Sequence, residues 1–169
     1  DSSAQDIQPT KGTITFTDQD LGDAISFSVQ GNAAALYNGG AVPIGDPAVD
    51  ISNLIAAGAI SFDDAGLQSN GGQQTIDWTF DPQAADLDWL KNGDTLTLTW
   101  LAQINDGHGN QGAQALTITI GGTNDLPTID ASSNPLDPIA EIPNDSSAQD
   151  IQPTKGTITF TDQDLGDAI

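Results

Sequence analysis

Apolar and polar residues alternate along most of this chain, which is the period of a half-buried β-strand and not that of a helix. Leu96, Leu98 and Trp100 alternate with threonines, and the pattern continues through Ala102 and Ile104. Turns rich in Gly, Asn and Asp separate six segments of this kind: 11–17, 25–29, 60–62, 76–80, 94–104 and 113–120. They predict an all-β protein folded as an antiparallel β-sandwich.

Two short segments carry helical signals instead. Segment 50–57 has Asp50 or Ser52 as a possible N-cap and Gly58 as a stop. Segment 82–91 begins with Pro and is followed by Asn-Gly. Both are expected to be short helical connectors, and the Gly- and Ala-rich segment 31–47 is expected to be a long loop.

The first 25 residues of the chain return letter for letter at its end, from residue 145 to residue 169. The offset between residues 1 and 145 is 144 residues. An active site can keep a few residues fixed, whereas 25 identical residues in a row indicate a recent tandem duplication. We therefore interpret the sequence as one period, plus an overlap, of a longer array of near-identical modules.

A run of prolines places the boundary between modules. Four prolines fall between residues 127 and 143, which is typical of a junction followed by an edge strand. Residues 1–125 are then a sandwich module that lacks its first strand, and residues 126–169 are the junction and the first strands of the next repeat. Residues 127–144 could supply the missing strand, so segment 127–169 is expected to project as a stub or to complement a neighbouring chain by strand exchange.

The charge of the chain limits the classes of partner that it can bind. It has 24 acidic residues against 3 lysines, a net charge of −21, and every acid except Glu141 is Asp. Asp suits turns and hard-cation sites, and a compact domain this acidic repels itself unless cations neutralise it. No basic patch is available to meet nucleic acid, and no apolar run is long enough for a membrane span.

The missing residue types exclude other chemistry. The chain has no Cys and a single His, His108, which argues against zinc and iron–sulfur sites. Without disulfides, bound Ca²⁺ is the expected stiffener of an extracellular domain. No nucleophile elbow, phosphate-binding loop or dinucleotide motif occurs, so the chain is predicted not to be an enzyme.

Three segments in order carry a family resemblance: GTITFTDQDLGD at 12–23, NDGHGNQGAQALTITI at 105–120 and GGTNDLPTI at 121–129. Together they resemble the VCBS-type, cadherin-like repeats of giant bacterial RTX adhesins, over most of the 144-residue period. The resemblance implies an immunoglobulin-like or cadherin-like Greek-key sandwich that Ca²⁺ stiffens. Such repeats act as spacers between adjacent identical modules.

The resemblance also implies a place and a role. Adhesins of this family leave the cell by type I secretion and hold a bacterium to a surface or to its neighbours. The implied location is therefore the extracellular bacterial cell surface. There the module would project adhesive domains for attachment and biofilm formation.

The cadherin-like strand order implies where the cation ligands gather. It brings Asp18, Asp20, Asp23 and Asp106 to one end of a module, and Asn124, Asp125 and the connector carrying Asp86 and Asp88 to the other. At each joint the second group would meet the first group of the next repeat. The expected Ca²⁺ ligands are Asp18, Asp20, Asp23, Asp106, Asn124, Asp125, Asp162, Asp164, Asp167 and Asp88, with Glu141 as a weaker candidate. Asp-rich turns also form for backbone reasons alone, which remains the alternative.

Two other functions stay open. In the first, the chain is a glycan- or cell-binding adhesin module that uses segment 31–58 and Trp89. In the second, it is an accessory domain of a secreted enzyme. Trp78 and Trp100 fall on the apolar phase of their strands, so they are expected in the core rather than on a sugar-binding surface.

Overall fold

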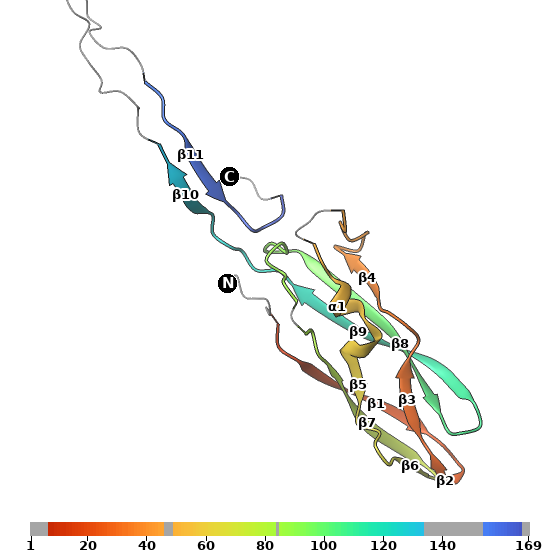
Figure 1. Cartoon of the computed structure of the whole chain (residues 1–169). Helices are drawn as coiled ribbons and strands as arrows, with labels where there is room; N and C mark the ends of the chain where they lie inside the picture. Colours follow the sequence, from red (N-terminus) through yellow and green to blue (C-terminus); the bar gives the residue numbers. More distant parts are fainter. Residues whose placement is uncertain (1–6, 46–48, 84, 134–153, 167–169) are drawn as a thin grey trace, which may run out of the picture. The chain divides into compact units, whose positions relative to one another are not determined.

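The computed structural model describes residues 7–45, 49–83, 85–133 and 154–166 (Figure 1). The chain divides into two compact units, Asp1–Asn124 (unit 1) and Asp125–Ile169 (unit 2). Strands dominate both units and every strand pair is antiparallel, so the all-β prediction is confirmed. Within the described residues, no helix is long and apolar enough to cross a membrane.

The first sheet of unit 1 has the order β1-β7-β5. It is formed by β1 (Thr10–Thr17), β7 (Gln73–Phe80) and β5 (Ile60–Phe62). Ile14 pairs with Ile76, and both side chains are buried, while the threonines beside Ile14 on β1 are exposed. The two-residue alternation therefore buries one face of this sheet, as the sequence predicts.

The second sheet is built around the long strand β8 (Thr95–Asn105). Strand β9 (Asn110–Gly121) pairs along one edge of β8. Strands β3 (Ser26–Val29) and β4 (Ala34–Tyr37) share the other edge, β3 near the end of β8 and β4 near its start.

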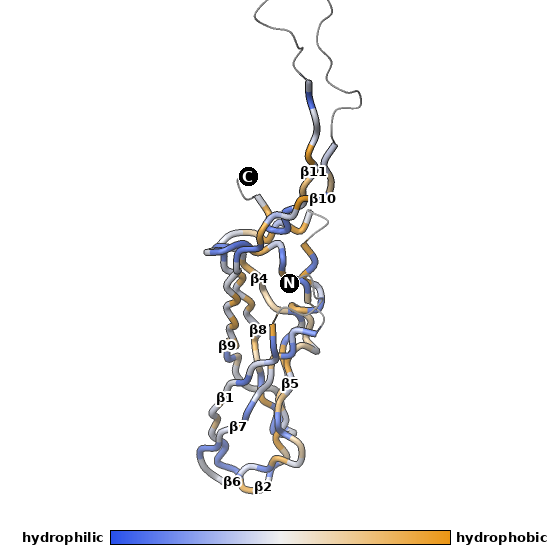
Figure 2. The backbone as a smooth tube through the Cα atoms, turned by 90° about the vertical axis from the view of Figure 1, so that its left-hand side faces the viewer, coloured by the Kyte–Doolittle hydropathy of each residue, from blue (hydrophilic) through white to orange (hydrophobic). Residues whose placement is uncertain are grey.

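Aromatic side chains fill the space between the two sheets. Phe27 of the second sheet lies between Phe16 and Phe62 of the first, with ring centroids 5.4 and 5.5 Å apart. Phe80 and Trp100 make a third contact at 5.5 Å, and both are 1% exposed. Such contacts join the sheets into a sandwich, and the hydrophobic positions recur along its strands in Figure 2.

One of the two predicted helical segments is helical. Segment 50–57 contains the four-residue helix α1 (Ser52–Ile55), followed by the 3₁₀ turn η1 (Ala57–Ala59). The Asp50 carboxylate accepts a hydrogen bond from the Ser52 backbone N–H at 2.9 Å. The N-cap residue is Ile51 and not the predicted Asp50 or Ser52, and Asp50 instead satisfies the amide of the first helical residue.

The prediction of a second helix at 82–91 is wrong in the described part of that segment. Gln83 has a φ of 56°, which a right-handed helix does not allow. The Asp86 carboxylate accepts from the Asp88 N–H at 3.2 Å, so a side chain takes the place of a helical carbonyl. The irregular path still buries Trp89, which is 1% exposed.

The expected loop at 31–47 is also interrupted, because it contains β4. Two further short strands, β2 (Leu21–Ala24) and β6 (Gln68–Asn70), pair with each other. Their polar and small residues give no clear alternation. Pairing with a partner strand, and not local pattern, makes these segments extended.

A buried polar cluster fastens β4 to the start of β8. Asp94 is 8% exposed and accepts hydrogen bonds from the Tyr37 hydroxyl at 2.5 Å and the Asn38 amide at 2.8 Å. Burial raises the pKa of Asp94, but the hydrogen bonds from Tyr37 and Asn38 and the charge of Lys91 outweigh it and hold the pKa below its ordinary value of 3.8. The same Tyr37–Asp94 bond, followed by burial, raises the pKa of Tyr37.

We expect Asp94→Asn to lower the free energy of unfolding by about 2 kcal/mol at pH 7, the value of hydrogen bonds to a charged group. Because the folded-state pKa of Asp94 is depressed, this stabilisation is present above pH 3.8 and is lost as the pH falls through the folded value. Urea unfolding of both chains at pH 7 and pH 3 measures the difference. A difference of the same size at both pH values would contradict the charged-acceptor explanation. Tyr37→Phe serves as the companion variant. Because the two residues share a hydrogen bond, the double variant should lose less free energy of unfolding than the sum of the two single variants.

In the described part of unit 2, β10 (Thr128–Ser132) and β11 (Ile158–Thr161) pair antiparallel, with a register shift after Ile129. The apolar side chains of β10 and β11, such as Ile129 and Phe160, are exposed to solvent, and Figure 2 shows hydrophobic stretches on both strands. Ile158 is 64% exposed, whereas Ile14, at the same position of the repeated sequence, is 9% exposed. Strand exchange with a neighbouring chain stays a prediction.

Candidate metal centre

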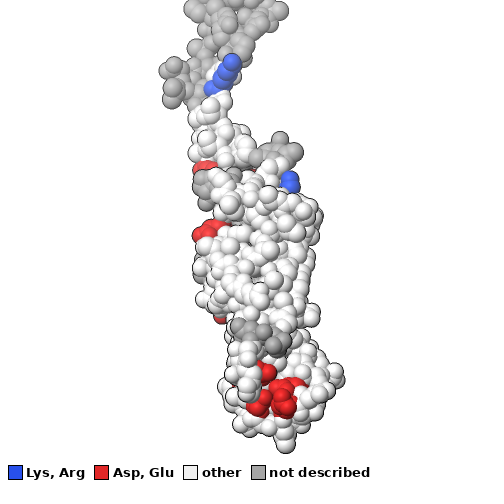
Figure 3. All heavy atoms as spheres, turned by 90° about the vertical axis from the view of Figure 1, so that its right-hand side faces the viewer, with Lys and Arg blue, Asp and Glu red and all other residues white. Residues whose placement is uncertain are grey.

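Three carboxylates gather where the chain passes from β1 into β2. One oxygen from each of Asp18, Asp20 and Asp23 lies within 4.8 Å of the others. Asp18 and Asp23 are half-buried and Asp20 is exposed. A group of acidic side chains is visible at one end of unit 1 in Figure 3.

The local sequence T-D-Q-D-L-G-D shapes this loop. The Asp18 carboxylate accepts the Asp20 N–H at 3.0 Å, which is an Asx turn. Gly22 has a φ of 92°, a conformation that side chains other than Gly rarely adopt. The turn and the glycine bring Asp23 back toward the first two carboxylates.

A buried serine from a distant strand supports the loop. Ser69 of β6 is 4% exposed. Its hydroxyl accepts the Asp23 N–H at 2.9 Å and donates to the Asp20 carbonyl. Sequence reasoning missed Ser69, because it lies 46 residues from Asp23 and belongs to no motif.

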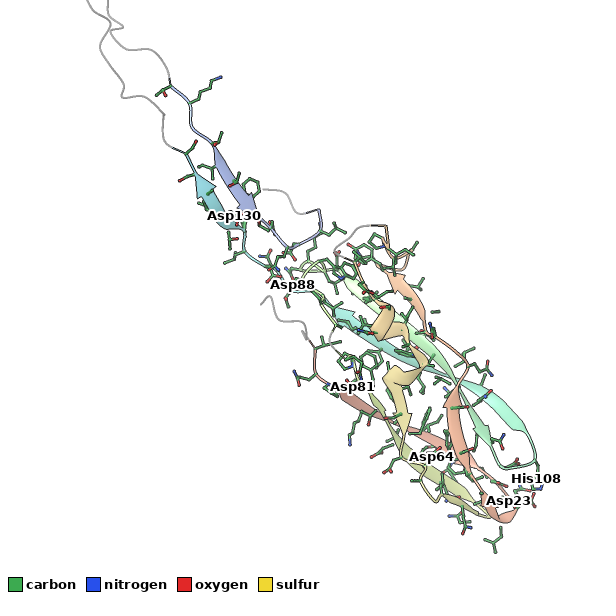
Figure 4. All side chains as sticks on the ribbon, in the orientation of Figure 1. Asp23, Asp64, Asp81, Asp88, His108 and Asp130 are labelled. Atoms are coloured by element: carbon green, nitrogen blue, oxygen red, sulfur yellow. The ribbon has the colours of Figure 1, made fainter. Side chains whose placement is uncertain are left out.

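The turn between β8 and β9 brings a histidine to the same cluster. His108 Nδ1 lies 3.6 Å from Asp23 Oδ2 and 4.0 Å from Asp106 Oδ1, and Figure 4 shows His108 beside Asp23. The Asp106 carboxylate also accepts the His108 N–H at 2.8 Å. Asp106 thus comes to the predicted end of the module, but as a neighbour of His108 and outside the cluster of three carboxylates.

The donor set fits a hard divalent cation. All three candidate ligands are carboxylates, and Ca²⁺ takes six to eight oxygens from carboxylates, carbonyls and water. Asp18 Oδ2 is buried and has no hydrogen-bond donor in the described part of the chain. An oxygen in that position costs free energy unless a cation or water meets it. Asp18, Asp20 and Asp23 would hold the ion.

The repeated copy of the loop adopts the same turn in unit 2. The Asp162 carboxylate accepts the Asp164 N–H at 3.2 Å, as Asp18 does for Asp20. Asp164 is 5% exposed and accepts the Asp125 N–H at 2.8 Å. The structure therefore brings together Asp125 and Asp164, two of the residues predicted at the joint.

The remaining predicted ligands are placed as follows. Asn124 is the last residue of unit 1, while Asp125 begins unit 2. Asp88 lies at the end of unit 1 opposite Asp23 (Figure 4). Asp167 and Glu141 lie outside the described residues.

The structure removes one ground for a sugar-binding site. Trp89 is 1% exposed, and its ring lies 5.8 Å from that of Tyr37. A buried indole offers no face on which a sugar can stack. Trp100 is equally buried, and Trp78 is half-buried on β7.

No protein-family model, curated protein or solved structure matches the chain.

Proposed function

We propose that this chain is a repeat from a long bacterial surface protein, in which it acts as a calcium-stiffened spacer between adjacent identical modules. The observation that carries the proposal is the cluster of Asp18, Asp20 and Asp23 at the end of β1. The same residues recur as Asp162, Asp164 and Asp167 in the duplicated segment. A cation loop that is copied along with the module suits a protein whose function depends on length.

Electrostatics supports a role for the ion in stiffness. Three carboxylates within 4.8 Å repel one another, and the chain carries a net charge of −21. A bound divalent cation turns this repulsion into attraction and fixes the loop. The acidic loop therefore repels itself less when Ca²⁺ is present, as it is outside cells.

The position of the loop links the ion to the junction between repeats. In unit 2 the loop contacts the junction residue Asp125 through the Asp164 carboxylate. Ordering of this loop by Ca²⁺ would therefore also order the segment that connects one repeat to the next. Sandwich modules joined in this way would project a terminal adhesive domain from an extracellular bacterial surface.

The test uses a chain of two consecutive 144-residue repeats. Small-angle scattering in about 1 mM Ca²⁺, the range of extracellular calcium modules, should show a rigid extended particle. EDTA should shorten the average end-to-end distance and broaden its distribution. Mg²⁺ at equal concentration controls for ionic strength. Identical scattering with Ca²⁺ and with EDTA would overturn the proposal.

A further inference from the structure

Strand β1 is the last strand of the β1-β7-β5 sheet, so one of its edges is unpaired among the described strands. The direction of its backbone groups follows from β7. The backbone N–H of Asp63 donates to the Asp77 carbonyl, so the backbone N–H and C=O groups of odd-numbered β7 residues point toward β5. Those of the even-numbered residues point toward β1. Ile76 pairs with Ile14, so the backbone groups of Ile14 point toward β7. The backbone groups that face the open edge of β1 are those of Thr13, Thr15 and Thr17.

Strand β11 shows which strand this edge accepts. Residues 155–161 are identical to residues 11–17, and β11 pairs with β10. Ser133 N donates to Thr157 O at 2.8 Å, so the odd-numbered threonines of this copy face β10. They correspond to Thr13, Thr15 and Thr17. The edge that β11 uses for β10 is therefore the edge that β1 leaves open.

A groove of mixed polar and apolar lining lies beside β1. It measures about 160 Å³ and lies between β1 and β9, the edge strands of the two sheets. Ile14, Phe16, Phe27 and Ile104 contribute its apolar lining. A strand added to β1 would place every second side chain over this groove.

We propose that segment 126–133 of another copy of this repeat adds to the open edge of β1 as an antiparallel strand. The register is the one that β10 makes with β11, which places Thr128 opposite Thr17 and Ile129 opposite Phe16. Phe16 lines the groove, so Ile129 would come to lie over it.

Pairing of β10 with β1 of another copy is favoured over pairing with β11. Strands β11 and β1 have the same sequence where β10 binds, so the ladder hydrogen bonds that are lost and gained are equivalent. The remaining difference is burial, because Ile129 is 73% exposed on β10 and would cover apolar side chains on β1. The contact is heterologous, so copies would join head to tail in open chains. No cation takes part, and the inference does not rest on the proposed calcium role.

Disulfide trapping tests the register directly, because the chain has no native Cys. Thr17 and Thr128 are exposed, and paired Cys residues at these positions would lie within bonding range. We expect oxidised T17C/T128C chains to form a ladder of linked dimers and larger species. In a mixture of unlabelled and ¹⁵N-labelled copies, mass spectrometry should find residue 17 of one copy joined to residue 128 of another.

The matched control is T117C/T128C, whose first thiol lies at an exposed position of β9 in the other sheet. T17C/T128C should give roughly tenfold more cross-linked product than this control, because pairing raises the local thiol concentration. Adding Ile129→Asp to T17C/T128C should remove most of that excess. EDTA should leave it unchanged, even if EDTA abolishes the rigidity of the two-repeat chain. A disulfide within one copy, or a yield equal to the control, would overturn the inference.

Discussion

Replacing both Asp20 and Asp23 by Asn should abolish the stabilisation that Ca²⁺ gives to this chain. An ion that binds only the folded state at a hundredfold excess over its Kd adds about 2.7 kcal/mol. For a chain of this length, that corresponds to a rise in Tm of roughly 5–10 °C. Calorimetric melts with Ca²⁺ and with EDTA measure it. The wild-type chain should show the rise and the double variant should not.

The sign of the effect should reverse in EDTA. Without a cation, the two substitutions remove like charges that lie within 4.8 Å of Asp18, so the variant should melt at or above the wild-type temperature. Asp77→Asn is the control of equal chemistry, because Asp77 is exposed on β7 and outside the cluster. The proposed calcium site would be refuted if the wild-type Tm did not rise with Ca²⁺. It would also be refuted if Asp77→Asn lost the rise as completely as the double variant.

The alternation in the sequence predicted the strands that have one buried face. Strand β8 is the clearest case, because Leu96, Leu98 and Trp100 are almost fully buried between exposed or half-buried neighbours. The same reasoning missed β2, β4 and β6, which are short and become extended by pairing. It also misassigned 82–91, where Gln83 has a left-handed φ and the Asp86 carboxylate accepts the Asp88 N–H.

The candidate metal centre divides in the same way. Asp18, Asp20 and Asp23 could be predicted together because a local turn joins them. Ser69 and His108 could not, because only the tertiary fold brings β6 and the β8–β9 turn to this loop. Ligands that lie close together in the sequence can be predicted from it, whereas the contacts that support them depend on the tertiary fold.

The duplicated segment shows how far identical sequence determines environment. Residues 155–161 and 11–17 have the same letters, and both copies form strands. Ile14 is nonetheless 9% exposed and Ile158 is 64% exposed. The strand tendency is local, but burial requires the opposing sheet that unit 1 supplies to β1.

The closing motif G-G-T-N-D contains a glycine that serves packing. Gly122 lies just past β9, and its N–H donates to the Asp94 carbonyl at 3.0 Å. A Cβ built at Gly122 would overlap the carbonyl oxygens of Leu90 and Lys91. These are backbone atoms of the two residues that follow the buried Trp89, so they cannot move aside cheaply. The motif thus keeps a glycine where the chain passes close to the irregular 82–91 segment.

Gly122→Ala should therefore lower the free energy of unfolding by about 3 kcal/mol, the upper range for overpacking a well-packed interior. Gly121→Ala is the matched control, because a Cβ at that position meets no atom within 4 Å. Its effect should stay within about 0.5 kcal/mol. Urea unfolding in EDTA, followed by Trp fluorescence, separates this packing effect from cation binding. Equal stability of the two variants would mean that the β9 terminus and the 82–91 segment can separate without cost, and that the glycine is kept for another reason.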